Sequence, residues 1–448
     1  MKRDALPDAD QAFHLLDEAV DRSSADETEA VLIAGAAGLT RFADSRIHQN
    51  VVGENVELLL RVAVGGRVAG FRTNRLSEAD VKAAVERAAE IARQTPADPD
   101  FPGLPHPAGG VWVGDRAVRA TAEATPRVRA ERVRLFVDAC GGASAAGALE
   151  TGVVAVAVAN SRGLRAYARR SRAALVSVVQ QGEGSGYVQT VDADLDHLDL
   201  AALGRRAGEK ARAGGEPADL EPGTYPVVLE QPAVALMLSY LAMTTFNGKA
   251  VLEGRSALAT RMGQQVMDPG VQIWDDAADP RTIGQPFDYE GVPKRRLDLV
   301  RDGVAVGAAY DSRTARRAGV PNTGHALPQP NAFGPVPTNL VMAPGEASLD
   351  QLIASVDRGV LITRFHYVRV VHPARTVITG MTRDGTFLIE GGRITRSLRN
   401  LRFNQSMLDA LAAVGAIGAE GRLVGEEMAV YAPPVLVDEF TFTSRTLF

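Results

Sequence analysis

Residues 236–246 read LMLSYLAMTTF, a stretch whose only polar atoms belong to hydroxyl groups. On a helix its apolar side chains would point in every direction, and Pro232 suits the first turn. Such a helix has no face fit for water, so it is predicted to be buried inside a domain or against another subunit. The rest of the chain must supply the layers that cover it.

The chain upstream of this helix alternates helical and hairpin patterns. Residues 8–22 and 77–94 carry apolar side chains at helical spacing. Between them, residues 30–74 are typical of β-strands, with a Gly65-Gly66 turn. This pattern predicts a first α+β sub-unit at 1–110.

A second α+β sub-unit is predicted at 120–216. Thr125 and Pro126 are expected to open a helix, a long hairpin turns around 160–163, and another helix follows at 198–215. The glycine-rich GEGSGY lies between them, and its spacing does not match that of a nucleophile elbow, so it is predicted to be a flexible loop.

Pro, Gly and acidic residues mark a boundary before Gly223, and strand signals dominate the third segment, 223–448. Turns at 302–303, 384–385 and 391–392 predict hairpins of a curled or barrel-like sheet. The predicted fold class is therefore α+β, with two N-terminal α+β sub-units followed by a β-rich C-terminal domain.

Two other stretches of this domain are candidates for binding. The loop at 318–339 is long and Pro-rich, which predicts either a lid or chamber wall containing His325, or a packed surface connection. Asn400, Arg402 and Asn404 would share one face of a strand, where they line a cleft or face solvent.

Composition excludes several classes of protein. One Cys among 448 residues rules out a disulfide framework, and a net charge of −5 argues against affinity of the whole protein for nucleic acid. The Arg-rich stretch 161–172 is predicted to be a solvated face, with a polyanion site as the alternative. No apolar stretch reaches the roughly 18 residues of a membrane span, so we expect a soluble, cytoplasmic protein.

Local motifs for hydrolysis are missing from the sequence. There is no HExxH, and His366 and His372 would stand roughly 20 Å apart on one strand, too far to share a metal. Four acids at 275, 276, 288 and 290 fall where turns are expected, so they are predicted to be turn and edge residues rather than an acid and base pair.

Four stretches together resemble the TldD/PmbA family, whose paired subunits form a bacterial zinc metalloprotease. They are LTRFADSRIHQNV at 39–51, VANSRGL at 158–164, FDYEGVPKRRLDLVRDGVAVG at 287–307 and VITGMTRDGTFLIEGGRI at 377–394. The resemblance runs over nearly the whole chain in the family's order. It implies the same three-part layout that the local patterns predict.

In the catalytic TldD-type subunit of this family, the buried helix carries His-Glu-x-x-x-His and a Cys near the C-terminus completes the zinc site. Matching that pattern to this chain places the ligand positions at Ser239, Thr244 and Ile417, and the catalytic acid at Tyr240. Neutral alcohols are poor zinc ligands, and isoleucine offers no donor. The resemblance therefore implies a TldE (PmbA)-like subunit that lacks the HExxxH motif and has no cofactor of its own.

Such a subunit is expected to pair with a TldD-like homologue that carries the zinc, and to form part of a chamber for unfolded or modified peptides. An extended peptide would bind there by strand addition. Two alternatives remain: a self-sufficient homodimeric enzyme with altered chemistry at residues 239, 240 and 244, and a regulator associated with DNA gyrase or DNA. A homodimer is also expected to be possible when the chain is alone.

Overall fold

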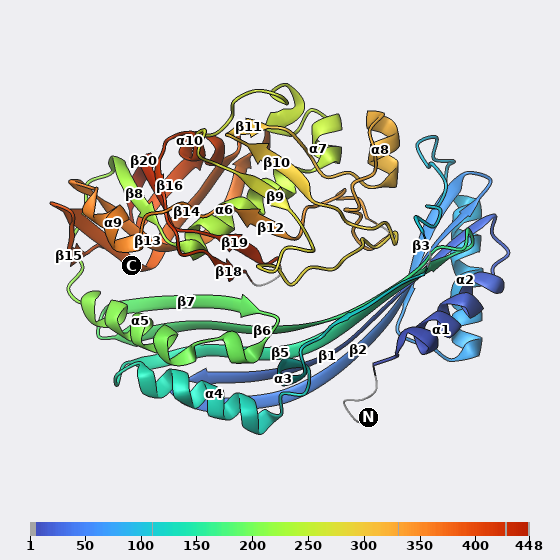
Figure 1. The fold of residues 1–448 in the computed structure, drawn as a ribbon, viewed down its shortest axis with the longest axis horizontal. Helices are drawn as coiled ribbons and strands as arrows, with labels where there is room; N and C mark the ends of the chain where they lie inside the picture. Colours follow the sequence, from blue (N-terminus) through green and yellow to red (C-terminus); the bar gives the residue numbers. More distant parts are fainter. Residues whose placement is uncertain (1–5, 110, 330, 426–427, 447–448) are drawn as a thin grey trace.

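The computed structural model describes residues 6–109, 111–329, 331–425 and 428–446. A long curved sheet forms one layer, and the C-terminal domain lies against one of its faces (Figure 1). The sheet has seven strands in the described ranges, in the order β3-β2-β1-β5-β6-β4, with β7 paired to the other end of β6. Its strands are β1 (Glu27–Ala43), β2 (Arg46–Val64), β3 (Arg67–Thr73), β4 (Trp112–Arg116), β5 (Ser144–Asn160), β6 (Arg165–Gln181) and β7 (Gly184–Asp192).

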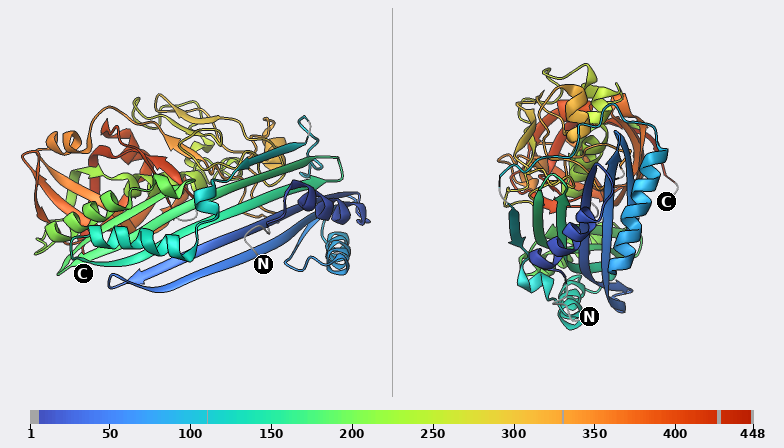
Figure 2. Two further views of the ribbon diagram at one scale, coloured as in Figure 1. Left: turned by 60° about the horizontal axis from the view of Figure 1, so that its bottom comes forward. Right: turned by 90° about the vertical axis from the view of Figure 1, so that its right-hand side faces the viewer.

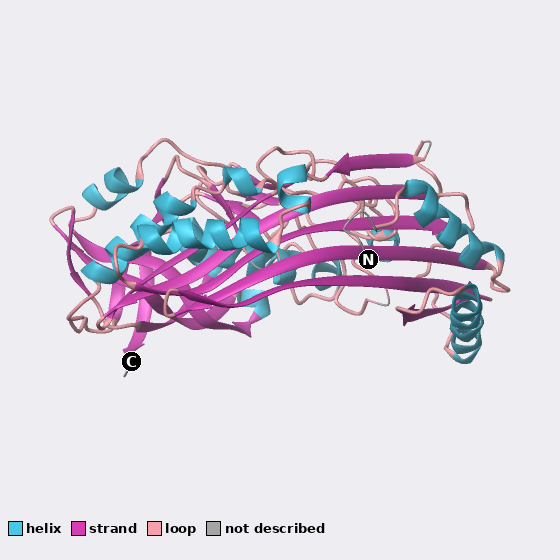
Figure 3. Cartoon of the chain, turned by 90° about the horizontal axis from the view of Figure 1, so that it is seen from below, coloured by secondary structure: helices cyan, strands magenta, loops and turns pink. Residues whose placement is uncertain are grey.

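Strands from the first two segments of the chain join in this one sheet. Strand β1 pairs antiparallel with β5 in unbroken register, from Glu29 opposite Asn160 to Phe42 opposite Gly147. Seen from below, the long strands run side by side along most of the molecule (Figure 3). The predicted hairpin turns at 65–66 and 160–163 are confirmed.

Helices cover the face of this sheet that points away from the C-terminal domain (Figure 2). Alternate residues of β1 and β5 pack under these helices, and the residues between them face the other way. The helices are α1 (Ala9–Asp21), α2 (Glu78–Gln94), α3 (Arg119–Ala122), α4 (Pro126–Ala139) and α5 (Leu200–Ala213). As predicted, Thr125 caps α4 through its side chain.

Only the first two residues of GEGSGY, 182 and 183, form a turn, and the other four begin strand β7 instead of continuing the predicted flexible loop. Its glycines allow helix α5 to approach closely, because a methyl group at Gly186 would overlap with the carbonyl oxygen of Ala207, and one at Gly184 with that of Ala211. The sequence prediction was wrong here because the need for glycine comes from a helix some 20 residues further along the chain.

The C-terminal domain contains a closed barrel, as the sequence predicts. The order β13-β8-β20-β16-β14 closes through pairing of β14 with β13. The strands are β8 (Gly223–Leu229), β13 (Arg358–His372), β14 (Val377–Glu390), β16 (Leu401–Ser406) and β20 (Val435–Arg445), with β15 (Arg393–Ser397) and β17 (Val414–Ile417) attached.

One predicted hairpin of this domain does not exist. Asp384 and Gly385 have positive φ but lie inside β14, where the register with β13 shifts between Ile362 and Arg364. They form a β-bulge, which bends a strand and thereby helps a sheet to close. The turns at 302–303 and 391–392 are hairpin turns, as predicted.

A second, smaller sheet stands beside the barrel, in the order β11-β10-β9-β12-β19-β18. Its strands are β9 (Ile273–Asp275), β10 (Leu297–Arg301), β11 (Val304–Ala305), β12 (Leu340–Met342), β18 (Arg422–Val424) and β19 (Val430–Ala432). The helices of the domain are α6 (Gln231–Thr244), α7 (Gly248–Leu252), α8 (Ser312–Ala318), α9 (Leu349–Ala354) and α10 (Met407–Ala412), with 3-10 turns at Ala257–Ala259 and Pro373–Arg375. A further 3-10 turn, Leu195–His197, lies between β7 and α5.

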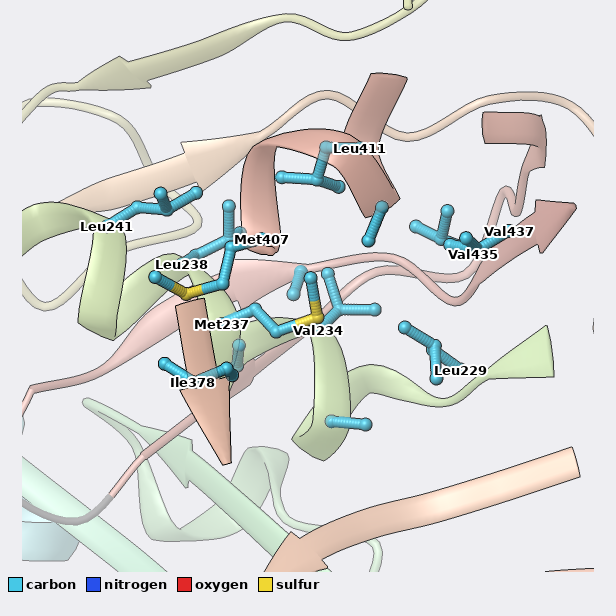
Figure 4. Close-up of a cluster of buried hydrophobic side chains, with 14 of the residues drawn as sticks. Leu229, Val234, Met237, Leu238, Leu241, Ile378, Met407, Leu411, Val435 and Val437 are labelled. Atoms are coloured by element: carbon cyan, nitrogen blue, oxygen red, sulfur yellow. The ribbon is translucent and has the colours of Figure 1, made fainter. Parts of the chain in front are cut away.

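Helix α6 is the apolar segment with which the sequence analysis began. It packs between barrel strands β8 and β13 and strands β18 and β19 of the smaller sheet. Val234, Met237, Leu238 and Leu241 of this helix gather with side chains from the barrel and α10 (Figure 4). No helix in the described ranges is both long and apolar enough to span a membrane.

Candidate functional site

One stripe of α6 is only partly buried within this chain, whereas the helix is predicted to be covered inside a domain or against another subunit. Leu236, Ser239, Tyr240, Met243 and Thr244 are partly exposed, whereas most other positions of the helix are buried. Their spacing of three and four residues places them on one face. This stripe contains the three α6 positions at which the family resemblance predicts degenerate zinc ligands or the catalytic acid.

The hydroxyl groups of this stripe are engaged by backbone carbonyl groups. Ser239 Oγ donates to Ala235 O at 2.9 Å, and Thr244 Oγ1 donates to Tyr240 O at 2.7 Å. Tyr240 Oη donates to Val368 O of strand β13 at 2.8 Å. These bonds hold the hydroxyls against the protein backbone and leave no free hydroxyl proton for an activated nucleophile.

The residues present do not fit a zinc ion. Ile417 lies in β17, pairs with Val435 and packs against the main core of the domain, so it contributes only carbon atoms at this position. In the described ranges, no group of three or more His, Cys, Asp or Glu side chains is placed to hold a metal ion. Alcohol groups already bonded to the backbone are a poor substitute for imidazole and thiolate.

A large cavity lies elsewhere, between the long sheet and the C-terminal domain. Its volume is about 680 Å³. Glycine and alanine of β1 and Gly152 of β5 form part of its wall, where the absence of large side chains leaves the space open. Residues 325–328, 336, 338 and 339 of the long loop form part of the opposite side, so this loop is a cavity wall.

His325 is buried at this wall. Its Nδ1 lies 2.9 Å from Thr323 Oγ1, and its Nε2 lies 3.1 Å from Asp275 Oδ1 without an aligned hydrogen bond. Burial lowers the pKa of His325 despite the attraction of Asp275. The imidazole is therefore neutral at pH 7.

The other predicted wall residues do not line this cavity. Arg402 and Asn404 are exposed on the outer face of β16, and Asn400 precedes that strand beside a smaller interdomain cavity. Alternation along β16 places Arg402 and Asn404 on one face, as the sequence suggests, but that face is outside the barrel.

The sequence analysis missed two cations of the cavity wall. Arg170 of β6 belongs to the Arg-rich stretch predicted to be solvated, and Lys294 follows the turn at 288–291. Alternation would have placed Arg170 and Arg172 together on one face of β6. Only the packing of the C-terminal domain shows which face becomes enclosed.

Three of the four acids expected at turns and edges are buried. Asp288 is 1% exposed and accepts backbone N–H groups from Glu290, Val292 and Ala326. Asp275 is also buried, and it accepts the backbone N–H and the side-chain amide of Asn339. The turn prediction for Asp288 and Glu290 was correct locally, but it gave no sign that the turn docks against the long sheet.

Two buried ion networks fasten the C-terminal domain to the long sheet and its helices. In one, Arg61 of β2 bridges Glu29 and Glu290, with each N–O distance 2.7 Å. In the other, Glu230 at the start of α6 binds Arg206 at 2.7 Å and Lys210, both from α5. These networks fix the two walls of the cavity relative to each other.

Comparison with known proteins places the chain in a family. Three family models match it in order: PmbA/TldA metallopeptidase domain 1 at residues 29–92, the central domain at 114–214 and the C-terminal domain at 222–444. A metalloprotease of Methanothermobacter thermautotrophicus is 26% identical over 341 residues, which is 70% of this chain and 74% of that protein. The metalloprotease PmbA homolog of Haemophilus influenzae is 23% identical over 404 residues, or 86% of each chain.

The fold also matches a solved structure. The crystal structure of TldE from Thermococcus kodakarensis superposes with a TM-score of 0.85, over 96% of this chain and 99% of that one, at 19% identity. The order of the three matched domains is the order of the long sheet's two halves followed by the barrel domain. The chain therefore belongs to the TldD/PmbA family.

Proposed function

We propose that this chain is the noncatalytic, TldE-like subunit of a two-subunit zinc metallopeptidase that acts on unfolded or modified peptides. The zinc ligands come from a TldD-like homologue, and this chain forms part of the peptide chamber. The observation that supports the proposal is the stripe of α6, where hydroxyls bonded to carbonyl groups stand at the positions to which the family resemblance assigns the metal-binding motif of the catalytic subunit.

The test is reconstitution. The chain is purified alone and after co-expression with the TldD-like homologue of its host, and zinc content and cleavage of an unstructured peptide are measured for both. We expect zinc and cleavage only when the homologue is present. Stoichiometric zinc and proteolysis by this chain alone would refute the proposal, and so would failure of the two chains to associate.

The two alternatives have less support. A self-sufficient enzyme would need a free hydroxyl or a ligand cluster on the α6 stripe, but the three hydroxyls there are bonded to carbonyl oxygens. A DNA-binding regulator would need free arginines in the stretch 161–172, yet Arg162 pairs with Glu27 and Arg165 pairs with Asp17. Ion-paired arginines in an acidic protein are a weak basis for binding phosphates.

A further inference from the structure

Two cations face the large cavity without carboxylate partners. Arg170 Nη1 donates only a long bond, 3.4 Å, to Ile283 O, and Lys294 Nζ donates to Thr338 Oγ1 at 2.8 Å. Within the described part of the chain, neither forms an ion pair. Because a guanidinium has five N–H donors and an ammonium has three, most of this donor capacity is unused.

Buried polar atoms on the same wall also lack hydrogen-bond partners. Gln285 is 5% exposed and lines the cavity, and its Oε1 accepts no hydrogen bond in the described structure. The Nε2 of His325 also has no aligned bond, but it lies 3.1 Å from Asp275 Oδ1, so Gln285 Oε1 is the atom that indicates a ligand. An unsatisfied buried polar atom costs roughly 1–3 kcal/mol, which is a reason to look for a ligand that satisfies it.

The acids near these cations already have donors of their own. Asp275 is held by Asn339 and lies beside His325, and Asp288 accepts three backbone N–H groups. Burial and the neighbouring Glu290 carboxylate raise the pKa of Asp288, whereas burial lowers the pKa of Lys294 against the attraction of Asp275 and Asp288. The hydrogen-bond donors of Arg170 and Lys294 are therefore not taken up by these acids.

The rim of the cavity carries one ion pair and one further acid. Arg172 pairs with Glu150 at 3.2 Å, and Glu54 is exposed at the margin. The opposing wall of small side chains in β1 and β5 leaves room for several residues of extended chain. The cavity thus combines an apolar, roomy wall with two convergent cations, as expected of a specific ligand site.

We propose that this cavity binds the carboxylate of an extended peptide, with its oxygens held between Arg170 and Lys294. Gln285 Oε1 then accepts an N–H group of the same peptide. The inference deepens the proposed function and rests on it in taking a peptide as the ligand. The carboxylate is either the C-terminus of the peptide or an Asp or Glu side chain, since both present the same two oxygens.

The test uses the full-length chain alone and three fluorescently labelled peptides of about seven residues. The first has a free C-terminus and no acidic side chain, the second is its C-terminal amide, and the third is that amide with one Glu. Fluorescence anisotropy gives the dissociation constants. Tight binding of the first assigns the site to the C-terminus, and tight binding of the third assigns it to an acidic side chain.

Substitutions test whether Arg170 and Lys294 bind the peptide carboxylate. Arg170→Met and Lys294→Met are each expected to weaken binding of the preferred peptide about 10- to 100-fold, the loss of a charge-assisted hydrogen bond. Lys294→Arg keeps the charge and is expected to retain most of the affinity. Arg169→Met is the matched control, because Arg169 is adjacent in β6 but lies beside Asp115. Circular dichroism shows whether each variant is folded, and Arg170→Gln replaces Arg170→Met if that variant is not.

The proposal is overturned if the amide without an acidic residue binds as tightly as the carboxylate peptides. It is equally overturned if no peptide binds at millimolar concentration, or if folded variants at both cations bind like the wild type. Failure of the proposed function is a separate result, because it would appear as absence of zinc-dependent cleavage or of association with the TldD-like homologue, and not in these binding constants.

Discussion

Replacing Glu230 with Gln tests whether the buried network at the start of α6 holds the two halves of the molecule together. The Glu230 carboxylate is 2% exposed and binds Arg206 and Lys210 of α5, while Lys210 also donates to Thr363 Oγ1 at 2.8 Å. The substitution keeps the size of the side chain and removes its charge. Two partly buried cations then lose their common partner.

The structure sets the magnitude of the effect. Burial alone would raise the pKa of Glu230, but Lys210 and Arg206 outweigh it and lower the pKa from 4.5 to about 2. At about 1.4 kcal/mol for each pH unit, this shift corresponds to roughly 3 kcal/mol of stability at pH 7. Breaking a buried ion pair typically costs about 3–5 kcal/mol. We expect the lower value, because Lys210 can lose its proton once Glu230 is neutral.

Urea unfolding at pH 7 measures this loss. Glu221→Gln is the matched control, since Glu221 pairs with Arg445 on the surface and is 79% exposed at its side chain. An exposed pair contributes about 0–1 kcal/mol, so the control should resemble the wild type. A Glu230→Gln protein within about 1 kcal/mol of the wild type would refute the reasoning.

Three further predictions concern the charge of Lys210, the packing of α5 on β7 and the hydroxyls of α6. Burial lowers the pKa of Lys210 from 10.5 to about 8. Between these pH values the unfolded chain binds more protons than the folded one, so the free energy of unfolding rises with pH by up to about 3 kcal/mol. In urea unfolding at several pH values, Lys210→Met should abolish this rise. Gly186→Ala should lower the free energy of unfolding by about 1–3 kcal/mol in the same assay, because its methyl group would overlap with α5. Gly53→Ala is the control, because Gly53 has open space around it, and it should change stability by less than about 0.5 kcal/mol. Equal effects of the two substitutions would contradict the packing argument. Ser239→Ala combined with Thr244→Ala should leave the peptide-cleavage rate of the reconstituted complex within about twofold of the wild type, and a loss above about tenfold would show that these hydroxyls take part in the reaction.

Local signals predicted the local structure well. Thr125 accepts the N–H of Val128 at the start of α4, where the sequence predicts a helix to open, and the Gly65-Gly66 turn joins β2 to β3. The apolar character of α6 predicted a largely buried helix, because the absence of a polar face is a property of the segment itself. These features depend on residues a few positions apart, which a sequence shows directly.

Features set by distant partners were not predictable in the same way. The strand at Gly184 contains glycines because α5 packs on it, and the Asp384-Gly385 pair forms a bulge because β13 continues beside it. The two cations of the cavity wall, Arg170 and Lys294, also depend on distant parts of the chain. Nothing in the neighbourhood of Arg170 or Lys294 indicates that the two side chains approach one space, since they are separated by more than a hundred residues and belong to different layers.

The continuous pairing of β1 with β5 governs how this protein can be dissected in the laboratory. A fragment ending near residue 110 would keep β1 but lose its neighbour along 14 paired positions, from Glu29 to Phe42. The exposed edge of β1 would then carry a long row of unpaired N–H and C=O groups, and such an edge strand promotes aggregation. Fragments for expression should therefore keep residues 6–192 together, even though two separate family models divide that region.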